Sequence, residues 1–536
     1  MRRRALLLLV IITTWLPLGA GDTVMEKEAT ARAVFERLVA ARGDNRKPAP
    51  YFVFTSSKRS GARSEGNRVI LEEAAYDLCS SFGPEAEAAL AGMLAHEIIH
   101  YYEGHSADNT AIGLVGDAGA SQQETEADYL GGFLSYLAGY PAANVMPRVL
   151  RSLYEIYELP DTLTGYPPLS ERIALADRTF RETRELITVF DMANVLTVLD
   201  RHAEAALYFD YLLQIFPSRE IYNNAGLVYV RAALPLFQPS SLTYVYPLEL
   251  DLRSRLSGQT RGPAVDSLTR AFYLRTAGEH FERARLLDDD YAPALLNLAS
   301  THALLSTSLV EGSPNSLSRE IACDRRTEAA LRAREAERLA NRLGQSLTAA
   351  NARMILGILA GLQGERDVAE RHFASAAESP LAATNLSVLR SGKLPTPTSG
   401  PQAAGFVMDE RIAGNTMTDL RLGAGAPQQR IQVARGGIPV QLAVLPPPAE
   451  RTTLLRHAAG DEPQELMVAF IQPGYDGTTA LEVAAGADRS AITAEYGSPA
   501  YSQLTAGGEL LVYPDSRLIF SLREGVLTHW ILYSEE

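Results

Sequence analysis

Cysteine is scarce in this chain of 536 residues, which contains only Cys79 and Cys323. Two cysteines exclude a disulfide-based scaffold, and a chain of this length can bury a hydrophobic core without one. In an oxidising compartment the two thiols could pair and tether the N-terminal part of the chain to the later part. We expect instead that both thiols are unpaired and buried.

Positive charge is also in short supply, because 50 lysine and arginine residues stand against 64 aspartate and glutamate residues. The formal net charge of −14 argues against nucleic acid or an anionic membrane surface as a direct ligand.

Long apolar runs are missing after the N-terminus, so we expect no transmembrane span in the rest of the chain. The N-terminus has three arginines, an apolar run over residues 5–18 and then small residues, an order typical of a secretory signal peptide. We expect cleavage after Ala20, giving a signal peptide over residues 1–20 and export to the bacterial periplasm. Leu18 stands three residues before the cleavage point, where leucine is less suitable than alanine. The alternative is therefore an uncleaved anchor that would hold the protein at the membrane. The absence of cysteine near the junction argues against a lipoprotein.

One short motif predicts a metal site, because residues 96–100 read H-E-I-I-H within the helix-forming stretch 86–102. Positions i and i+4 share a helix face, so His96 and His100 could bind one zinc ion. Glu97 would lie beside the open coordination position and act as general base towards a zinc-activated water. The alternative is two histidines on an ordinary polar helix face.

A second acidic segment, residues 124–132 (ETEADYLGG), comes later at a distance that fits a helix antiparallel to the first. Glu124 and Asp128 share one face of this helix, whereas Glu126 points away. We therefore assign Glu124 as the third metal ligand. We assign Asp128 to the outer shell, where it would accept the second N–H of a ligating histidine. The alternative is an acidic, solvated helix face.

Three segments together resemble the signature blocks of the HtpX/CAAX-prenyl-protease family of gluzincin zinc metalloendopeptidases. They are residues 89–106 (ALAGMLAHEIIHYYEGHS), residues 124–132 (ETEADYLGG) and residues 166–173 (YPPLSERI). The resemblance covers about residues 45–180. It implies that His96, His100 and Glu124 bind zinc, that Glu97 is the general base, and that His105 is not a ligand.

The third block departs from the family pattern, because Tyr166 stands where the family has histidine. A phenol there could donate a hydrogen bond to an oxyanion or gate the metal, and the alternative is a plain loop tyrosine. Arg172 would fix the block to the catalytic domain through an ion pair. The family's architecture also implies that residues 67–71 (NRVIL) form an edge strand beside the cleft, to which an extended substrate could add.

Residues 186–392 are rich in Ala, Leu, Arg and Glu, and their pattern matches tetratricopeptide (TPR) repeats. The clearest copy contains Leu356, Gly357, Ala360, Gly364, Ala369, Phe373, Ala376 and Pro380. Such repeats stack into a superhelix with a concave face. The alternative is an unrelated helical bundle. Four histidines in this region, 202, 280, 302 and 372, are expected to be surface or packing residues, and residues 234–263 interrupt the pattern as an insertion.

Residues 393–405 form a Pro/Gly/Ser-rich linker. In the final segment, Leu420, Ile431 and Gly436 recur at equal offset as Leu481, Ile492 and Gly497, which predicts two units of strand, short helix and turn. Alternating patterns predict strands at 510–513, 518–522 and 528–533. We therefore expect a small α+β module at residues 406–536.

The expected fold is multidomain and mainly helical: a gluzincin-type α+β metalloprotease domain at 21–185, a TPR solenoid at 186–392, and the C-terminal module. The expected function is an exported zinc metalloendopeptidase with one Zn²⁺ per chain, of the periplasmic BepA-like branch. It would act in envelope protein quality control on protein substrates, with partners held by the repeats. The alternatives are a TPR scaffold, adaptor or chaperone-like protein with a structural or occluded zinc site, and a processing enzyme with one target.

Overall fold

The computed structural model describes most of the chain. The described residues are 23–44, 46–58, 61–105, 110–111, 120–158, 169–238, 240–250, 254–255, 267–312, 315–379, 381–392, 410–433, 440–459, 465–505, 508–523 and 525–535. The expected signal peptide, Tyr166, Pro380 and the linker lie outside them, as does the side chain of Arg172. Within these ranges no helix has the length and apolar character needed to cross a membrane. The chain divides into two compact units, residues 1–187 and 188–536.

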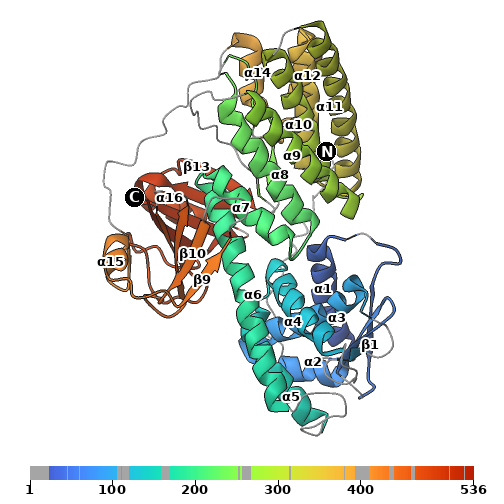
Figure 1. Ribbon diagram of the computed structural model, residues 1–536, viewed down its shortest axis with the longest axis vertical. Coiled ribbons are helices and arrows are strands. Elements are labelled where there is room, and N and C mark those ends of the chain that lie inside the picture. The colour runs from blue at the N-terminus through green and yellow to red at the C-terminus, as the bar shows by residue number, and fades with distance from the viewer. Residues whose placement is uncertain are drawn as a thin grey trace, which may run out of the picture. The chain divides into compact units, whose positions relative to one another are not determined.

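The described ranges are mainly helical, with sixteen α-helices and a large sheet near the C-terminus. A multidomain, mainly helical chain was expected, and this coarse expectation is confirmed. In Figure 1 the colour follows the chain from blue to red, so the strands near the C-terminus appear in orange to red.

The first unit is built around one buried helix, α3. Its helices are α1 (Val24–Arg42), α2 (Glu73–Ser80), α3 (Ala86–Glu103), α4 (Ala120–Leu137), α5 (Met146–Ile156) and the first part of α6 (Leu169–Val198). Helix α3 contacts α1, α2, α4 and α5 as well as the sheet, and it is buried along almost its whole length. It ends at Gly104, whose left-handed backbone (φ 68°) costs least at glycine.

A four-stranded sheet accompanies these helices in the order β1-β3-β2-β4. The strands are β1 (Tyr51–Thr55), β2 (Ala62–Glu65), β3 (Arg68–Glu72) and β4 (Thr110–Ala111). The expectation of an edge strand at residues 67–71 is wrong, because β3 pairs with β1 on one side and β2 on the other. Its side chains Val69, Ile70 and Leu71 are all buried, as is typical of an inner strand. The strand that contacts α3 most extensively is β2.

The second unit contains the end of α6 and a run of further helices. They are α7 (His202–Leu213), α8 (Arg219–Ala233), α9 (Ser267–Leu287), α10 (Ala292–Gly312), α11 (Ser316–Arg342), α12 (Ser346–Leu362), α13 (Arg366–Ala374) and α14 (Ala382–Ser391). From α7 onwards each helix packs against the next, and Figure 1 shows α8 to α12 side by side in green to yellow.

Glycines allow two of these helix pairs to approach closely. A Cβ atom on Gly226 of α8 would lie 2.7 Å from the ring of Phe281 on α9, and one on Gly357 of α12 would lie 2.5 Å from Phe373 on α13. Both phenylalanines are fully buried. Each glycine therefore makes room for an aromatic side chain of the following helix.

A ten-stranded sheet has the order β5-β6-β13-β14-β15-β16-β12-β11-β10-β9. Its strands are β5 (Glu249–Leu250), β6 (Ser254–Arg255), β9 (Gln429–Gln432), β10 (Val440–Leu445), β11 (Thr452–Ala459), β12 (Leu466–Ile471), β13 (Tyr501–Thr505), β14 (Gly508–Tyr513), β15 (Leu518–Arg523) and β16 (Val526–Glu535). The three strands predicted between residues 510 and 533 are confirmed as β14, β15 and β16. The two remaining strands, β7 (Arg411–Ile412) and β8 (Asn415–Thr416), pair only with each other.

The insertion predicted at residues 234–263 supplies β5 and β6, and Arg255 of β6 pairs with Leu504 of β13. Helix α7 reaches the same sheet through buried polar contacts. The Tyr208 hydroxyl and His457 Nδ1 on β11 lie 2.8 Å apart, and Glu204 contacts the other nitrogen of the same ring. Segments far apart in the sequence therefore build one sheet.

The predicted repeat of the C-terminal module is wrong in its register. Ile431 lies in strand β9, whereas Ile492 lies in helix α16 (Arg489–Tyr496). The structure repeats a capped helix instead: Thr416 caps α15 (Met417–Leu422) and Asp488 caps α16. Helix α15 is followed by Gly-Ala-Gly-Ala-Pro and helix α16 by Gly-Ser-Pro, and one residue later a strand begins in each case.

Both cysteines are free in the described part of the chain, with Cys79 buried and Cys323 exposed. The prediction that Cys323 is buried is wrong, because it lies on the polar helix α11.

Candidate metal centre

Helix α3 brings the two histidines of the H-E-I-I-H segment together. His96 and His100 are buried, with exposed fractions of 2% and 1%, and their Nε2 atoms lie 3.0 Å apart. Two imidazole nitrogens can approach so closely because the residues are one helical turn apart on the same face.

Glu124 of helix α4 completes the cluster. Its Oε2 atom lies 3.3 Å from His96 Nε2 and its Oε1 atom lies 3.3 Å from His100 Nε2. The three side chains offer ligand atoms that all lie within 4.8 Å of one another, in a buried position. Two imidazoles and one carboxylate form the donor set that zinc takes in catalytic sites.

Gly131 explains how α4 comes so near to α3. A Cβ atom at this position would lie 3.0 Å from the backbone nitrogen of His96 and 3.2 Å from the carbonyl carbon of Ala95. Backbone atoms cannot move aside easily, so only glycine permits this approach. Because Gly131 lies beside His96 while Glu126 lies beside His105, the two helices run antiparallel, as expected.

Glu97 lies on the same helix and is fully buried. Among the described residues, neither of its carboxylate oxygens has a hydrogen-bond partner of normal geometry, although the backbone of Ser64 on β2 acts to lower its pKa. Burial dominates and raises the pKa of Glu97 to about 8. A buried carboxyl group with few partners is a good proton acceptor.

Asp128 contacts the outer nitrogen of one histidine. Its Oδ1 atom lies 2.8 Å from His96 Nδ1, which leaves Nε2 of the same ring directed at Glu124. The structure therefore places Asp128 where the spacing argument assigned it.

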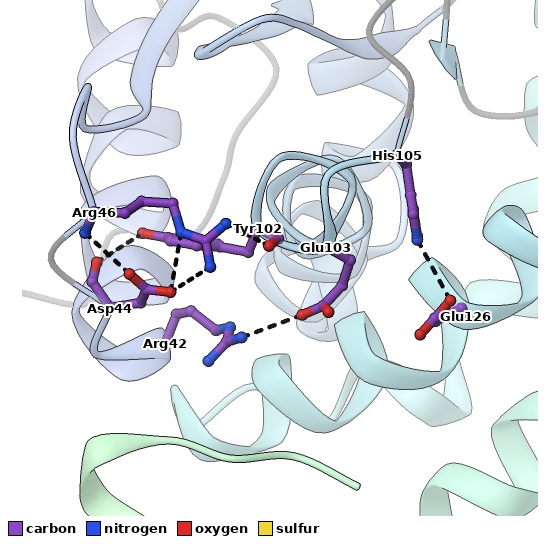
Figure 2. A network of polar contacts seen from close by, with 7 residues as sticks. All are labelled: Arg42, Asp44, Arg46, Tyr102, Glu103, His105 and Glu126. Carbon is purple, nitrogen blue, oxygen red and sulfur yellow. Dashed lines mark hydrogen bonds and ion pairs between the residues drawn. The ribbon is translucent and has the colours of Figure 1, made fainter. Parts of the chain in front are cut away.

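His105 contacts the outer nitrogen of the other histidine, with 2.9 Å between His105 Nδ1 and His100 Nδ1. On its far side, His105 Nε2 lies 3.4 Å from Glu126 Oε2. Figure 2 shows His105 pointing to Glu126 on one side of α3. On the other side Arg42 forms an ion pair with Glu103.

The charges of the cluster shift its pKa values in opposite directions. Burial acts to lower the pKa of His96, but hydrogen bonds and charges from Asp128 and Glu124 raise it well above its ordinary value. Burial lowers the pKa of His100. Burial acts to raise the pKa of Glu124, but its close contacts with His100 and His96 hold it well below its usual range. The carboxylate and one neutral imidazole are therefore ready to bind a cation.

The residues fit a metal ion. Among the described residues, the buried Oε2 atom of Glu124 has no hydrogen-bond partner, although it faces a ring nitrogen at 3.3 Å. A cation between the three side chains would satisfy this oxygen and both Nε2 atoms at once. The donor set excludes the harder ions Ca²⁺ and Mg²⁺ as preferred occupants, because these ions take mainly oxygen ligands.

Helical spacing identified all three residues of the cluster, His96, His100 and Glu124. It gave no role to His105, Glu126 or Gly131. The paired glycines at 131–132 could have suggested a close helix approach. The contact of His105 depends on the turn at Gly104 and had no local signal. Comparisons with known protein families, with curated proteins and with solved structures give no match to this chain.

Proposed function

We propose that this chain is a zinc-dependent metalloendopeptidase of the HtpX/CAAX-prenyl-protease type. The observation that carries the proposal is the convergence of His96, His100 and Glu124, with ligand atoms within 4.8 Å of one another. These three side chains would hold the ion. A bound zinc ion supplies an activated water and polarises the carbonyl of the scissile peptide bond.

The chain's own residues provide the proton transfer and the positioning. Glu97 is buried next to the ligands and can take up a proton from the attacking water and pass it to the leaving amine. Asp128 holds the ring of His96 by its Nδ1 atom. Both functions need a fixed geometry, which the buried helix α3 provides.

An extended peptide could bind at the sheet beside α3. Strand β2 contacts α3 and pairs with β3 and β4. In the described part of the chain, β4 is the outermost strand on this side. A substrate strand would therefore add next to β4, where main-chain hydrogen bonds give affinity with little side-chain selection.

The helical array of the second unit supports a role in partner binding. Its successive packed helices and its two glycine–phenylalanine contacts are features of TPR-type repeats, which bind proteins on a concave face. We propose that this array recruits protein substrates or partners. Together with the signal peptide expected from the sequence, this supports the proposal of an exported protease of envelope protein quality control, in the periplasm.

The test is to measure zinc content and proteolysis of the purified protein together. We expect one zinc per chain and cleavage of casein, both lost in His100→Ala. A chain that holds zinc but cleaves no protein would instead support the scaffold alternative. A chain that holds no zinc would refute both.

A further inference from the structure

Each histidine of the metal centre has one nitrogen facing the cluster and one facing outwards. For His96 the outward atom is Nδ1, which lies 2.8 Å from a carboxylate oxygen of Asp128. For His100 the outward atom is also Nδ1, and it lies 2.9 Å from Nδ1 of His105. The two imidazoles are therefore held by different partners.

Two ring nitrogens at hydrogen-bond distance must share one proton, since one donates and the other accepts. To bind a metal through Nε2, His100 must offer a lone pair there, so its proton lies on Nδ1. His105 Nδ1 then accepts this proton's hydrogen bond, and the proton of His105 lies on Nε2. That atom lies 3.4 Å from Glu126 Oε2, a carboxylate that can only accept.

The backbone fixes His105 in this position. Gly104 adopts the left-handed conformation with φ 68°, which turns the chain back over the end of α3. The amide of His105 then donates a hydrogen bond to the carbonyl of His100 at 3.1 Å. The side chain of His105 is only 6% exposed, and Figure 2 shows it directed at Glu126.

We propose that His105 is a positioning residue for the metal centre: it accepts the outer N–H of His100 and so fixes the tautomer and ring orientation that bind zinc. The carboxylate of Glu126 faces His105 Nε2 and so favours the tautomer of His105 that carries its proton on that nitrogen. This inference rests on the zinc binding of the proposed function. It gives Glu126 a role that its direction on α4 had excluded, because it acts through His105 and does not reach the metal.

The test compares zinc affinity of full-length variants by competition with a chromophoric chelator, without any substrate. Leucine at position 105 cannot accept a hydrogen bond, so His105→Leu should weaken zinc binding by about tenfold to a hundredfold, the usual cost of losing an outer-shell partner. Asparagine can place an oxygen where Nδ1 lies, so His105→Asn should keep most of the affinity. Glu126→Ala should weaken binding less than His105→Leu, and it should have no further effect in the His105→Asn background.

Glu87→Ala, at an exposed position near the start of α3, is the control for loss of a surface charge. Circular dichroism of the metal-free variants checks folding, and Glu126→Ala keeps the test decisive if the His105 variants fail to fold. Unchanged zinc affinity in His105→Leu, or equal losses in His105→Leu and His105→Asn, would overturn the inference.

The outcome is separable from that of the proposed function. A wild-type protein that binds zinc without cleaving any protein refutes the peptidase while the affinity comparison still decides the role of His105. An active protein whose affinity ignores position 105 refutes only this inference. A wild-type protein without zinc affinity refutes both.

Discussion

Glu97 follows the proposed metal ligand His96 in the sequence, and it is not one of the three residues whose ligand atoms converge, His96, His100 and Glu124. Replacing Glu97 should therefore reduce catalysis without affecting zinc binding. We expect Glu97→Gln to keep its zinc and to lose proteolysis by about two to four orders of magnitude, because the proton acceptor is gone while all ligands stay. Zinc content and casein hydrolysis measure the two effects. Glu87→Gln, a surface change on the same helix, is the control. Wild-type turnover in zinc-loaded Glu97→Gln would refute the mechanism.

Replacing Glu124 and replacing Glu126, the two glutamates of α4, should have different effects on zinc binding. Glu124 contacts both Nε2 atoms, so Glu124→Ala should leave the protein without zinc after dialysis. Glu126 contacts only His105, so Glu126→Ala should keep the ion with weaker affinity. Metal analysis of both dialysed variants tests this, and equal zinc retention would reverse the assignment.

At the scale of single residues, the sequence predicted the contacts that depend on spacing within one helix. His96, Glu97 and His100 lie within five residues, and the pair at 124 and 128 shares a face by helical spacing alone. The contact between His100 and His105 could not be predicted, because it depends on a left-handed turn. Glu126 lies outside the cluster of His96, His100 and Glu124, but helical spacing cannot show contacts that pass through a third residue.

Helix packing in the second unit depends on glycines that meet aromatic rings. Gly357→Ala would bring a methyl group within 2.5 Å of Phe373, and we expect it to lower the free energy of unfolding by about 1–3 kcal/mol. Gly278→Ala on α9 is the matched control, since the nearest atom would be 3.9 Å away. There the better helix propensity should raise stability by up to about 1 kcal/mol. Urea denaturation measures both, and equal effects would contradict the packing argument.

The α8–α9 pair should also be sensitive to acid. His280 stacks on Tyr229 at 5.5 Å, and burial lowers its pKa to about 4, although Asp210 lies 3.7 Å from its Nε2 atom. An unfolded histidine has a pKa of about 6.5. Between these two values the unfolded chain binds a proton that the native chain does not, so stability is full above the upper value and falls as the pH falls.

This one group can contribute a slope of at most about 1.4 kcal/mol per pH unit. We expect His280→Gln to flatten the dependence of unfolding free energy on pH in that window. Urea titrations at several pH values, followed by the fluorescence of the buried Trp530, provide the measurement. An unchanged slope would show that His280 is already protonated in the native protein.

Elements were predictable where the pattern was local and long. Helix α3 and strands β14 to β16 follow from helical stretches and alternation. The position of β3 inside its sheet was missed because strand chemistry does not tell which neighbours a strand has. The predicted repeat in the C-terminal module rested on identical residue types at equal spacing. The capped helices at Thr416 and Asp488 show that N-cap residues were the better guide to the repeated element.

At the scale of the whole molecule, catalysis and recruitment should be separable. A chain ending at residue 187, where the first unit ends, keeps the metal cluster and removes the apolar part of α6 that packs within the second unit. We expect it to bind zinc and to cleave an unfolded generic substrate. It should lose its physiological partners in crosslinking, because the recruiting surface is gone. Zinc content and circular dichroism show whether it has folded, and capture of the same partners by the shortened chain would refute this division.

The ten-stranded sheet also imposes an order on folding. It joins β6 to β13 and α7 to β11, so its contacts connect early and late parts of the chain. Contacts of such high sequence separation form slowly, whereas single helices form in about a microsecond. Until the C-terminal strands have been synthesised, α7, β5 and β6 therefore have no sheet to join. During this interval the nascent chain exposes strand-forming and apolar surface, which makes the partly folded second unit prone to aggregation until the last strand has been made.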